Sequence, residues 1–492
     1  MPSDKHNHHV LRALRRWANW TLLALALMFV ALAVWIRVRF GDVSFDQIVT
    51  NLPIGAGKGI GNNTLAIEVA VWCIVVPVAF VVLLALTARR FGRIGARRPV
   101  KLIPAVSLVA GFSVFLAVAG VPEFAMAQLS ETSIAPYYVA PSVTSAPAKP
   151  RNLITIYLES GENTYGDEAV MGENLLANLD AATDPGDGWI DYQGLNQYEG
   201  GGWTMAGLVG TQCGVPLKSL IATEGLDFNK LGEEVAHYLP GATCLGDVLA
   251  GQGYRSVFVG GADDDFAGKK TFLTDHGYDQ VLGLSDWKGS DSADYISKEW
   301  GLADSHTLKH AADVLDKLHA GSQPFNLTVL TLDTHEPPGI FPDCDYPESV
   351  PMATAIQCSM KAVGTFLRHA ERAGYLDDTA VVVMGDHVKG TGDQDAFRGV
   401  LRAQEHRTII FRLWSPDGLS ITRESVDQLS VLPTTLELLG FGLDGGRAGV
   451  GVSFVGDHDL TGTALALSDQ EYRTLLKAPS TEIYQQFWNA DH

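Results

Sequence analysis

The chain has 492 residues and a formal net charge of −20, which is unevenly distributed. Residues 1–101 contain 13 Lys and Arg against 4 Asp and Glu, a net +9, whereas the remainder contains 23 against 52, a net −29. The length allows a membrane part and one large soluble domain. The acidic remainder argues against a nucleic acid as a partner, because a nucleic-acid site needs a basic surface.

Three apolar runs precede residue 122, at about 17–38, 65–88 and 102–121. Each is close to the ~20 residues that a membrane helix needs. The first run is longer than the apolar part of a signal peptide, and no clear cleavage site follows it. The N-terminus and the segment between the second and third runs are basic, so the positive-inside rule places both in the cytoplasm. We therefore expect three spans, with everything after about residue 122 outside the cytoplasm.

Cysteine usage agrees with an exported domain. Cys73 lies within the second apolar run, and the other four cysteines all follow residue 122. An even number of cysteines suits two disulfides in an oxidising compartment. Three connectivities are possible, and nearest-neighbour pairing would join Cys213 to Cys244 and Cys344 to Cys358. A zinc site is the alternative, which the absence of C-x-x-C spacing disfavours.

The rest of the chain is predicted to form an α/β domain. Residues 122–150 include Ala-Pro-Ser-Val-Thr-Ser-Ala-Pro at 140–147 and are predicted to be a linker. In residues 151–492 we expect strands at Leu153–Leu158, Arg255–Val259, Phe325–Leu332, Thr379–Met384 and Thr408–Leu413, and helices at His306–His319, Ser359–Ala373 and Ser425–Leu439. Apolar strands separated by helices indicate a mostly parallel sheet flanked by helices. Ligands of such sheets bind beyond the carboxyl ends of the strands.

Acidic and imidazole side chains follow three of the predicted strands. Glu159 follows the first strand, His335 the third, and Asp386 with His387 the fourth. Singly, each is more simply explained as a helix cap or a turn residue. Jointly they resemble a hydrolytic metal site, because carboxylate and imidazole ligands suit Mn²⁺, Mg²⁺ or Zn²⁺.

Thr204 lies in a glycine-framed stretch, residues 201–207, that could supply a nucleophile to this site. A hydroxyl needs a base or a metal to become a good nucleophile near neutral pH. Glycines let the backbone bring the hydroxyl close to a substrate. A glycine-rich turn with a helix-capping threonine is the alternative for these residues alone.

Several of these stretches resemble the sulfatase-like membrane phosphoglycerol transferases of the alkaline phosphatase superfamily. They are Asn152–Ser160, Thr204–Leu217 and Gly385–His387. Other motifs are similar to the phosphoglycerol transferase I branch, which modifies osmoregulated periplasmic glucans: Cys244–Asp247, Gly261-Ala262, Phe266–Lys269, His276–Tyr278 and Asp333–His335. In the lipoteichoic acid synthase branch an Arg stands near position 269 and a His precedes the Gly near 261. Lys269 and Gly260 in these places favour the glucan branch.

The resemblance implies a fold, a reaction and roles for named residues. It implies an alkaline-phosphatase-like catalytic domain in the periplasm, tethered to the inner membrane. Thr204 would attack phosphatidylglycerol, release diacylglycerol, and carry a phosphoglyceryl group to a periplasmic glucan. Glu159, Thr204, Asp386 and His387 would hold one divalent ion, Mn²⁺ or Mg²⁺. His335 would bind the substrate or assist proton transfer, and Lys269 would contact the phosphate.

Other functions remain open at this point. Within enzymes, they are a phosphoethanolamine transferase and a lipid phosphodiesterase that uses water as the acceptor. A different class is a non-catalytic envelope protein that binds anionic lipid or glucan. A binding protein has no need of all four residues of the predicted metal site, so the sequence favours an enzyme.

Overall fold

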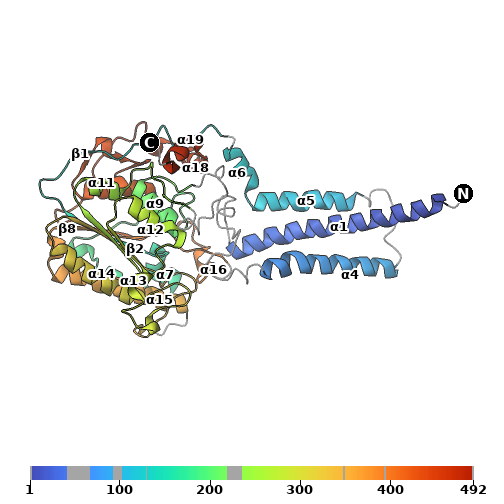
Figure 1. The fold of residues 1–492 in the computed structure, drawn as a ribbon, viewed down its shortest axis with the longest axis horizontal. Helices are drawn as coiled ribbons and strands as arrows, with labels where there is room; N and C mark the ends of the chain where they lie inside the picture. The colour runs from blue at the N-terminus through green and yellow to red at the C-terminus, as the bar shows by residue number, and fades with distance from the viewer. Residues whose placement is uncertain are drawn as a thin grey trace. The chain divides into compact units, whose positions relative to one another are not determined.

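The computed structural model describes residues 3–40, 67–91, 102–128, 130–218, 235–346, 350–392 and 395–489. By internal contacts, the chain divides into two compact units. The first consists of Met1–Leu129 with Gly392–Gln394, and the second of Ser130–Thr391 with Asp395–His492. The described residues 3–40, 67–91 and 102–128 of the first unit are almost all helical, and the second unit contains the predicted sheet (Figure 1).

The first unit contains the three apolar runs as helices. They are α1 (Ser3–Phe40), the π-helical turn at Val69–Val75 that continues as α4 (Val76–Phe91), and α5 (Ile103–Val118), followed by α6 (Val121–Gln128). Helix α1 packs along α5 and α4 (Figure 1). Leu14–Arg39 and Val69–Ala88 are long and apolar enough to cross a membrane, whereas the apolar helix Ile103–Val118 is shorter. The third predicted span therefore has 16 helical residues.

A seven-stranded sheet forms the centre of the second unit, in the order β3-β9-β8-β2-β7-β5-β6. The strands are β2 (Asn152–Leu158), β3 (Ile190–Asp191), β5 (Arg255–Gly260), β6 (Gln280–Leu282), β7 (Phe325–Leu330), β8 (Thr379–Gly385) and β9 (Phe411–Trp414). The pairs β8–β2, β2–β7, β7–β5 and β5–β6 are parallel, and β9 pairs antiparallel with both β8 and β3. The predicted mostly parallel α/β sheet is confirmed.

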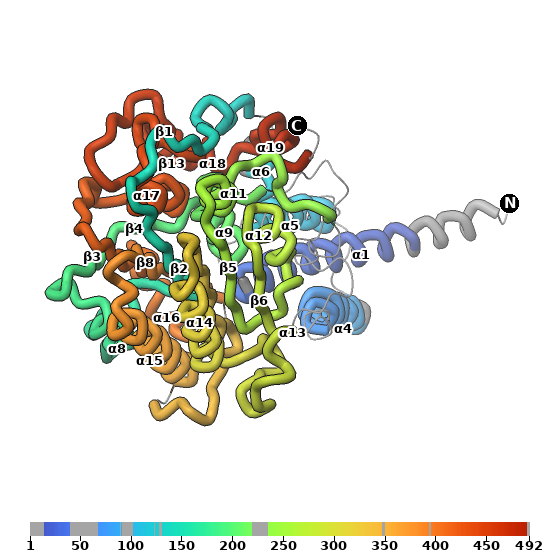
Figure 2. The backbone as a smooth tube through the Cα atoms, turned by 60° about the vertical axis from the view of Figure 1, so that its left-hand side comes forward, coloured from blue at the N-terminus to red at the C-terminus, as the bar shows by residue number. Residues whose placement is uncertain are grey.

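Helices cover both faces of this sheet because its buried strands are apolar on both sides. Along β2, Leu153 and Tyr157 enter one core, and Ile154, Ile156 and Leu158 enter the other. The first core includes α9 (Thr204–Cys213), α11 (Leu245–Gly251), α12 (Lys269–Asp275) and α17 (Val431–Leu438). The second includes α14 (Asp304–His319) and α15 (Pro351–Arg372). Figures 1 and 2 show these two groups of helices on opposite sides of β2.

Shorter elements complete the second unit. The helices are α7 (Glu168–Met171), α8 (Ala177–Asp180), α13 (Leu284–Trp287), α16 (Arg398–Leu401), α18 (Asp469–Lys477) and α19 (Thr481–Trp488). The two-stranded pairs are β1 (Val143–Ser145) with β11 (Gly442–Leu443), β4 (Leu195–Asn196) with β10 (Val426–Asp427), and β12 (Arg447–Ala448) with β13 (Gly451–Val452). The predicted linker, residues 122–150, thus contains most of α6 and the whole of β1. Through β1 its later part pairs with the second unit.

Three predicted elements differ most from the structure in the residue at which they begin. The helix predicted from Ser425 begins at Val431, because Val426 pairs with Leu195 and the Asp427 side chain accepts the Leu429 backbone N–H. The last predicted strand begins at Phe411, and it is antiparallel. Helix α15 begins at Pro351, eight residues before the predicted start, because proline fits the first turn of a helix.

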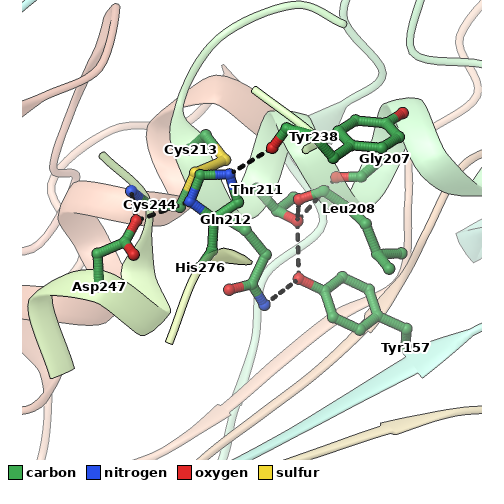
Figure 3. Close-up of a disulfide and its surroundings, with 10 residues drawn as sticks. All are labelled: Tyr157, Gly207, Leu208, Thr211, Gln212, Cys213, Tyr238, Cys244, Asp247 and His276. Carbon is green, nitrogen blue, oxygen red and sulfur yellow. Dashed lines mark hydrogen bonds and ion pairs between the residues drawn. A yellow bond between two sulfur atoms is a disulfide. The ribbon is translucent and has the colours of Figure 1, made fainter. Parts of the chain in front are cut away.

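The four cysteines of the second unit form two disulfides. Cys213 bonds to Cys244, and Cys344 bonds to Cys358, as nearest-neighbour pairing predicts. Cys73 is a free, buried thiol. The Cys213–Cys244 bond joins the end of α9 to the residue that precedes α11. His276 lies beside this bond, but its two ring nitrogens contact Asp247 Oδ2 and the Tyr238 carbonyl oxygen, so the group is occupied internally and is no zinc site (Figure 3).

Candidate active site

The candidate site lies at the carboxyl ends of β2 and β8. These strands pair in parallel up to Leu158 and Gly385, so the residues that follow, Glu159 and Asp386, emerge side by side. Tyr157 and Met384 both face the core that contains α9. Because side chains alternate along a strand, Glu159 and Asp386 continue toward the same face. The sheet register therefore brings together two residues that are 227 positions apart in the chain.

Thr204 reaches this pair from the first residue of α9. Its Oγ1 lies 3.1 Å from Glu159 Oε2, and the hydroxyl donates a hydrogen bond to that oxygen. Helix α9 can approach the end of β8 only because residue 207 is glycine: a Cβ there would lie 2.1 Å from the Asp386 carbonyl oxygen. The helix N-terminus also presents unpaired backbone N–H groups, which favour an anion beside Thr204.

Glu159, Asp386 and His387 together fit a divalent metal ion. One ligand atom from each lies within 4.8 Å of the others, and all three residues are buried. Asp386 Oδ1 accepts the backbone N–H groups of Ser160 and His387, each at 2.8 Å. Its Oδ2 is buried and has no hydrogen-bond partner among the described residues. A buried carboxylate oxygen left without a donor is the position that a cation would fill.

The tautomer of His387 supports the same assignment. Nδ1 lies 2.9 Å from the Val388 carbonyl oxygen, so this nitrogen must carry the hydrogen. Nε2 then offers its lone pair to the site, 3.6 Å from Asp386 Oδ2 and 3.7 Å from Glu159 Oε1. Thr204 Oγ1, which lies 3.1 Å from Glu159 Oε2, would be the fourth ligand atom. The four residues predicted as metal ligands are therefore assembled in one place.

Charge in the site is unbalanced without a cation. Burial, together with the neighbouring Glu159 carboxylate, raises the pKa of Asp386 to about 7. Burial also acts against ionised Glu159, but His335 and His387 outweigh it and lower the pKa of that carboxyl. Burial disfavours charged His387, yet the two carboxylates raise the pKa of its imidazole. Two buried carboxylates this close favour a positive charge between them.

His335 and Lys269 lie near these ligands without belonging to them. His335 stacks on Trp300 with ring centroids 3.8 Å apart, and its Nδ1 lies 2.9 Å from the Glu336 carbonyl oxygen. Lys269 is only 5% exposed. Burial lowers the pKa of Lys269, although the carboxylates of Asp264, Asp263, Glu159 and Asp386 act in the opposite direction. A buried lysine facing carboxylates is a suitable contact for a substrate phosphate.

The structure adds an ionic network that the sequence analysis missed. Lys389, two residues after His387, is buried, and its Nζ lies 2.8 Å from Glu336 Oε1. Its backbone N–H donates to Glu162 Oε2 at 3.0 Å. Arg407 forms an ion pair with Glu162 and donates to the Lys389 carbonyl oxygen. The network thus fixes the segments that follow β2, β7 and β8 to one another, including the loop that carries His335.

A hydrogen-bonded chain fixes α9 against β2. Gln212 Nε2 donates to the Tyr157 hydroxyl at 3.1 Å, and Tyr157 Oη lies 2.7 Å from Thr211 Oγ1. Thr211 in turn donates to the Gly207 carbonyl oxygen at 2.7 Å (Figure 3). Tyr157 precedes Glu159 by two residues, and Thr211 lies on the same helix as Thr204. The chain therefore fixes the helix of the candidate nucleophile relative to the strand of the candidate ligand.

Removing the Tyr157 hydroxyl tests this anchor. We expect Tyr157→Phe to lower the free energy of unfolding by about 1–3 kcal/mol, because the buried Gln212 amide loses its acceptor. Tyr238→Phe is the matched control: this tyrosine is equally buried, but its hydroxyl has no partner among the described residues. Chemical denaturation of both variants measures the difference. Equal destabilisation by the two substitutions would contradict the anchor.

Metal binding is expected to stabilise the protein through Asp386. At an ion concentration of about 100 times its Kd, Mn²⁺ or Mg²⁺ should raise the free energy of unfolding by about 2.7 kcal/mol. Asp386→Asn should abolish this increase, because the neutral amide cannot replace the unpaired Oδ2 as an anionic ligand. The same variant without metal should be at least as stable as the parent, since a carboxylate next to Glu159 is removed. Thermal shifts with and without a chelator measure both effects, and an ion-induced shift that survives in Asp386→Asn would rule out this site.

Part of the chain is similar to a known protein family. Residues 233–441 match the sulfatase family. This region contains Lys269, His335, Asp386 and His387, whereas Glu159 and Thr204 precede it.

Two curated relatives are similar to a larger part of the chain. Phosphoglycerol transferase I of Xanthomonas campestris pv. campestris is 36% identical over 310 residues, which are 60% of this chain and 42% of that protein. Phosphoglycerol transferase I of Escherichia coli O6:K15:H31 is 31% identical over 316 residues, 62% of this chain and 39% of that protein. The chain therefore spans less than half the length of these relatives.

Two solved structures share the fold. A protein of the alkaline phosphatase superfamily from Vibrio parahaemolyticus superposes with a TM-score of 0.50 at 20% identity, over 75% of this chain and 97% of that one. The lipoteichoic acid synthase LtaP from Listeria monocytogenes gives a TM-score of 0.50 at 17% identity, over 71% and 96%. Residues 233–441 thus match the sulfatase family, the chain shares the fold of these two solved structures, and it is similar in sequence to phosphoglycerol transferase I.

Proposed function

We propose that the protein transfers a phosphoglyceryl group from phosphatidylglycerol to a periplasmic glucan, with Thr204 as the nucleophile. The observation that carries the proposal is the position of Thr204 Oγ1, at a helix N-terminus and 3.1 Å from Glu159 in a buried acid and imidazole cluster. The similarity to phosphoglycerol transferase I supports the choice of donor and acceptor. A single cluster of this kind serves both halves of a two-step transfer.

In the first half-reaction Thr204 Oγ1 attacks the phosphorus of phosphatidylglycerol. The bond from phosphorus to the diacylglycerol oxygen breaks, and a phosphoglyceryl group remains on Thr204. The threonine proton leaves along its hydrogen bond to Glu159 Oε2, and the departing oxygen takes a proton from His335. In the second half-reaction an acceptor hydroxyl replaces diacylglycerol and the proton movements reverse. A divalent ion held by Glu159, Asp386 and His387 would lower the pKa of the hydroxyl and neutralise charge on the phosphoryl oxygens.

Positive groups of the chain itself bind the phosphodiester. Lys269 is buried beside the carboxylate ligands, and the N-terminus of α9 presents backbone N–H groups at Thr204. Both stabilise the negative charge of a pentavalent phosphorus centre. His335 is stacked on Trp300 and fixed through Glu336, so its ring is oriented before substrate binds. These contacts recognise a phosphodiester. The surrounding loops would determine which headgroup is accepted.

Membrane attachment suits a lipid donor. We infer that α1, α4 and α5 cross the inner membrane as three spans, with residues after about 122 forming a linker and the periplasmic domain. Two of these helices are long and apolar enough to span, and the basic segments favour this orientation. Tethering raises the effective concentration of the domain at the bilayer surface.

The experiment uses the full-length protein with vesicles that contain one labelled lipid. With phosphatidylglycerol labelled in the headgroup glycerol, we expect equal amounts of diacylglycerol and of labelled phosphoglyceryl glucan. Label from phosphatidylethanolamine instead would identify a phosphoethanolamine transferase. Release of glycerol phosphate to water, with glucan present, would identify a phosphodiesterase. No cleavage of either lipid would contradict catalysis and leave an envelope-binding protein.

A further inference from the structure

A cavity lies outside the residues assigned so far. It has a volume of about 550 Å³ and lies between α14, α15 and the loop that follows β7. Its walls include Ser305, Leu308 and Ala312 on α14, and Ala362 and Thr365 on α15. Spacings of three and four residues place these side chains on one face of each helix. We call this cavity the α14–α15 groove.

The groove begins at the same edge of the sheet as the candidate active site. Helices α14 and α15 precede the parallel strands β7 and β8, so each helix starts near the carboxyl edge of the sheet. Asp304, at the start of α14, accepts hydrogen bonds from the Leu332 backbone and from Ser359 of α15. The inner end of the groove is therefore fixed to the segment that follows β7.

One short loop separates the groove from the catalytic residues. Asp333 lines the groove. The next residue, Thr334, donates its hydroxyl to the Glu159 carbonyl oxygen at 2.6 Å. His335 is the next residue in the chain. A ligand at the inner end of the groove would therefore contact Asp333, which precedes His335, the group proposed to transfer protons, by two residues.

Polar groups at the inner end of the groove lack partners. Ser305 Oγ is buried and makes no hydrogen bond within the described part of the chain. Asp333 is 8% exposed, and Oδ2 accepts the Asp304 backbone N–H at 3.0 Å, whereas Oδ1 has no partner among the described residues. Burial and the nearby Asp304 raise the pKa of Asp333 well above its usual range, so its carboxyl group can also donate. A ligand hydroxyl can pair with Asp333 Oδ1, whereas a hydrocarbon chain cannot, so a hydroxyl-rich ligand fits here.

The remaining walls suit a sugar. Phe341 is half-buried and lines the groove with apolar ring surface, which can cover the C–H face of a pyranose. Lys309 and Arg372 are exposed side chains at its lining, within a part of the chain whose net charge is −29. These cations would keep an anionic, partly substituted oligosaccharide from being repelled by the acidic domain. The volume is within the range of small-ligand sites, about 300–1,000 Å³.

We propose that the α14–α15 groove is the acceptor site and binds an oligosaccharide, with one hydroxyl directed past Asp333 toward the active site. The inference rests on the proposed transfer reaction and adds the location and chemistry of its second substrate. The acceptor oxygen then attacks the phosphorus held by Thr204. The bond from phosphorus to Thr204 Oγ1 breaks, Oγ1 regains a proton, and the acceptor proton passes to His335.

A bulky side chain in the groove tests the proposal. Thr365 is exposed, lines the groove, and can be replaced without disturbing the core. Full-length protein is incubated with phosphatidylglycerol vesicles and a panel of glucose trisaccharides that differ in linkage. The measured quantity is phosphoglyceryl sugar formed per diacylglycerol released. We expect Thr365→Trp to lower this ratio at least tenfold. Glu371→Trp, exposed on the same helix but outside the groove, should keep the parent ratio.

Other results have defined meanings. An unchanged ratio in Thr365→Trp would overturn the acceptor assignment. An equal fall of both products would assign the groove to the lipid donor and would also overturn it. If the parent protein cleaves no lipid, the proposed function fails, but the groove is still tested by titrating the trisaccharides into the lipid-free protein. Binding lost in Thr365→Trp and retained in Glu371→Trp would then support a sugar site, and equal binding would refute it.

Discussion

Thr204→Ala is expected to reduce diacylglycerol release by ~10⁴-fold or more, because the substitution removes the attacking hydroxyl at the start of α9. Thr204 Oγ1 is the hydroxyl that contacts Glu159 Oε2, and Gly207 brings its helix against Asp386. The folded protein should be preserved, since the methyl group of alanine fits where threonine stood. The measurement is lipid cleavage per protein molecule, alongside a melting curve.

Thr204→Ser supplies the matched comparison. Serine keeps the hydroxyl at the start of α9, so activity should recover to within ~10–100-fold of the parent. If Thr204→Ala melts normally, binds the metal and still cleaves lipid at more than a hundredth of the parent rate, Thr204 is excluded as the nucleophile.

Arg407→Ala is expected to have the largest effect on stability, a loss of about 3–5 kcal/mol in the free energy of unfolding. Glu162 is completely buried, and Arg407 is the cation that pairs with it. Removing the guanidinium would leave an uncompensated carboxylate in the interior and free the Lys389 carbonyl oxygen. Because Lys389 holds Glu336, the loop with His335 should also become less ordered.

Denaturant unfolding followed by tryptophan fluorescence measures this loss. Arg402→Ala is the control, because Arg402 is exposed on the same segment, and such surface changes usually stay within about 0.5 kcal/mol. A loss below about 1 kcal/mol in the free energy of unfolding for Arg407→Ala would mean that the buried Glu162 carboxylate is stabilised without Arg407 and would contradict the prediction.

The sequence predicted those parts of the fold that have a local pattern. The run Val381–Val383 and the run Leu153–Leu158 are apolar on both sides, which is typical of a central parallel strand, and both are central strands. Edge elements were harder to predict. Val426 pairs with Leu195 across 231 positions, and no feature of the local sequence distinguishes that bridge from a first helical turn.

In the candidate site, too, some residues could be predicted from the sequence and others could not. Glu159, Asp386 and His387 were predictable because a parallel sheet brings strand ends together. Lys389, Glu336, Glu162 and Arg407 were missed, since an ion pair between distant segments has no sequence period. One signal was available for Lys389: a lysine two residues after Asp386-His387 lies in the same strand-end loop. Nothing comparable marked Ser305, and the motif Asp333–His335 did not indicate that an Asp333 oxygen lacks a partner, which is apparent only in three dimensions.

Intact mass spectrometry of the full-length protein tests the central claim most directly. The protein is incubated with phosphatidylglycerol and Mn²⁺ without an acceptor, stopped with acid, and then digested to locate any adduct. The account predicts a mass increase equal to one phosphoglyceryl group, located on Thr204 and absent from Thr204→Ala. Diacylglycerol release with the adduct on another residue, or with the same adduct still formed by Thr204→Ala, would contradict it.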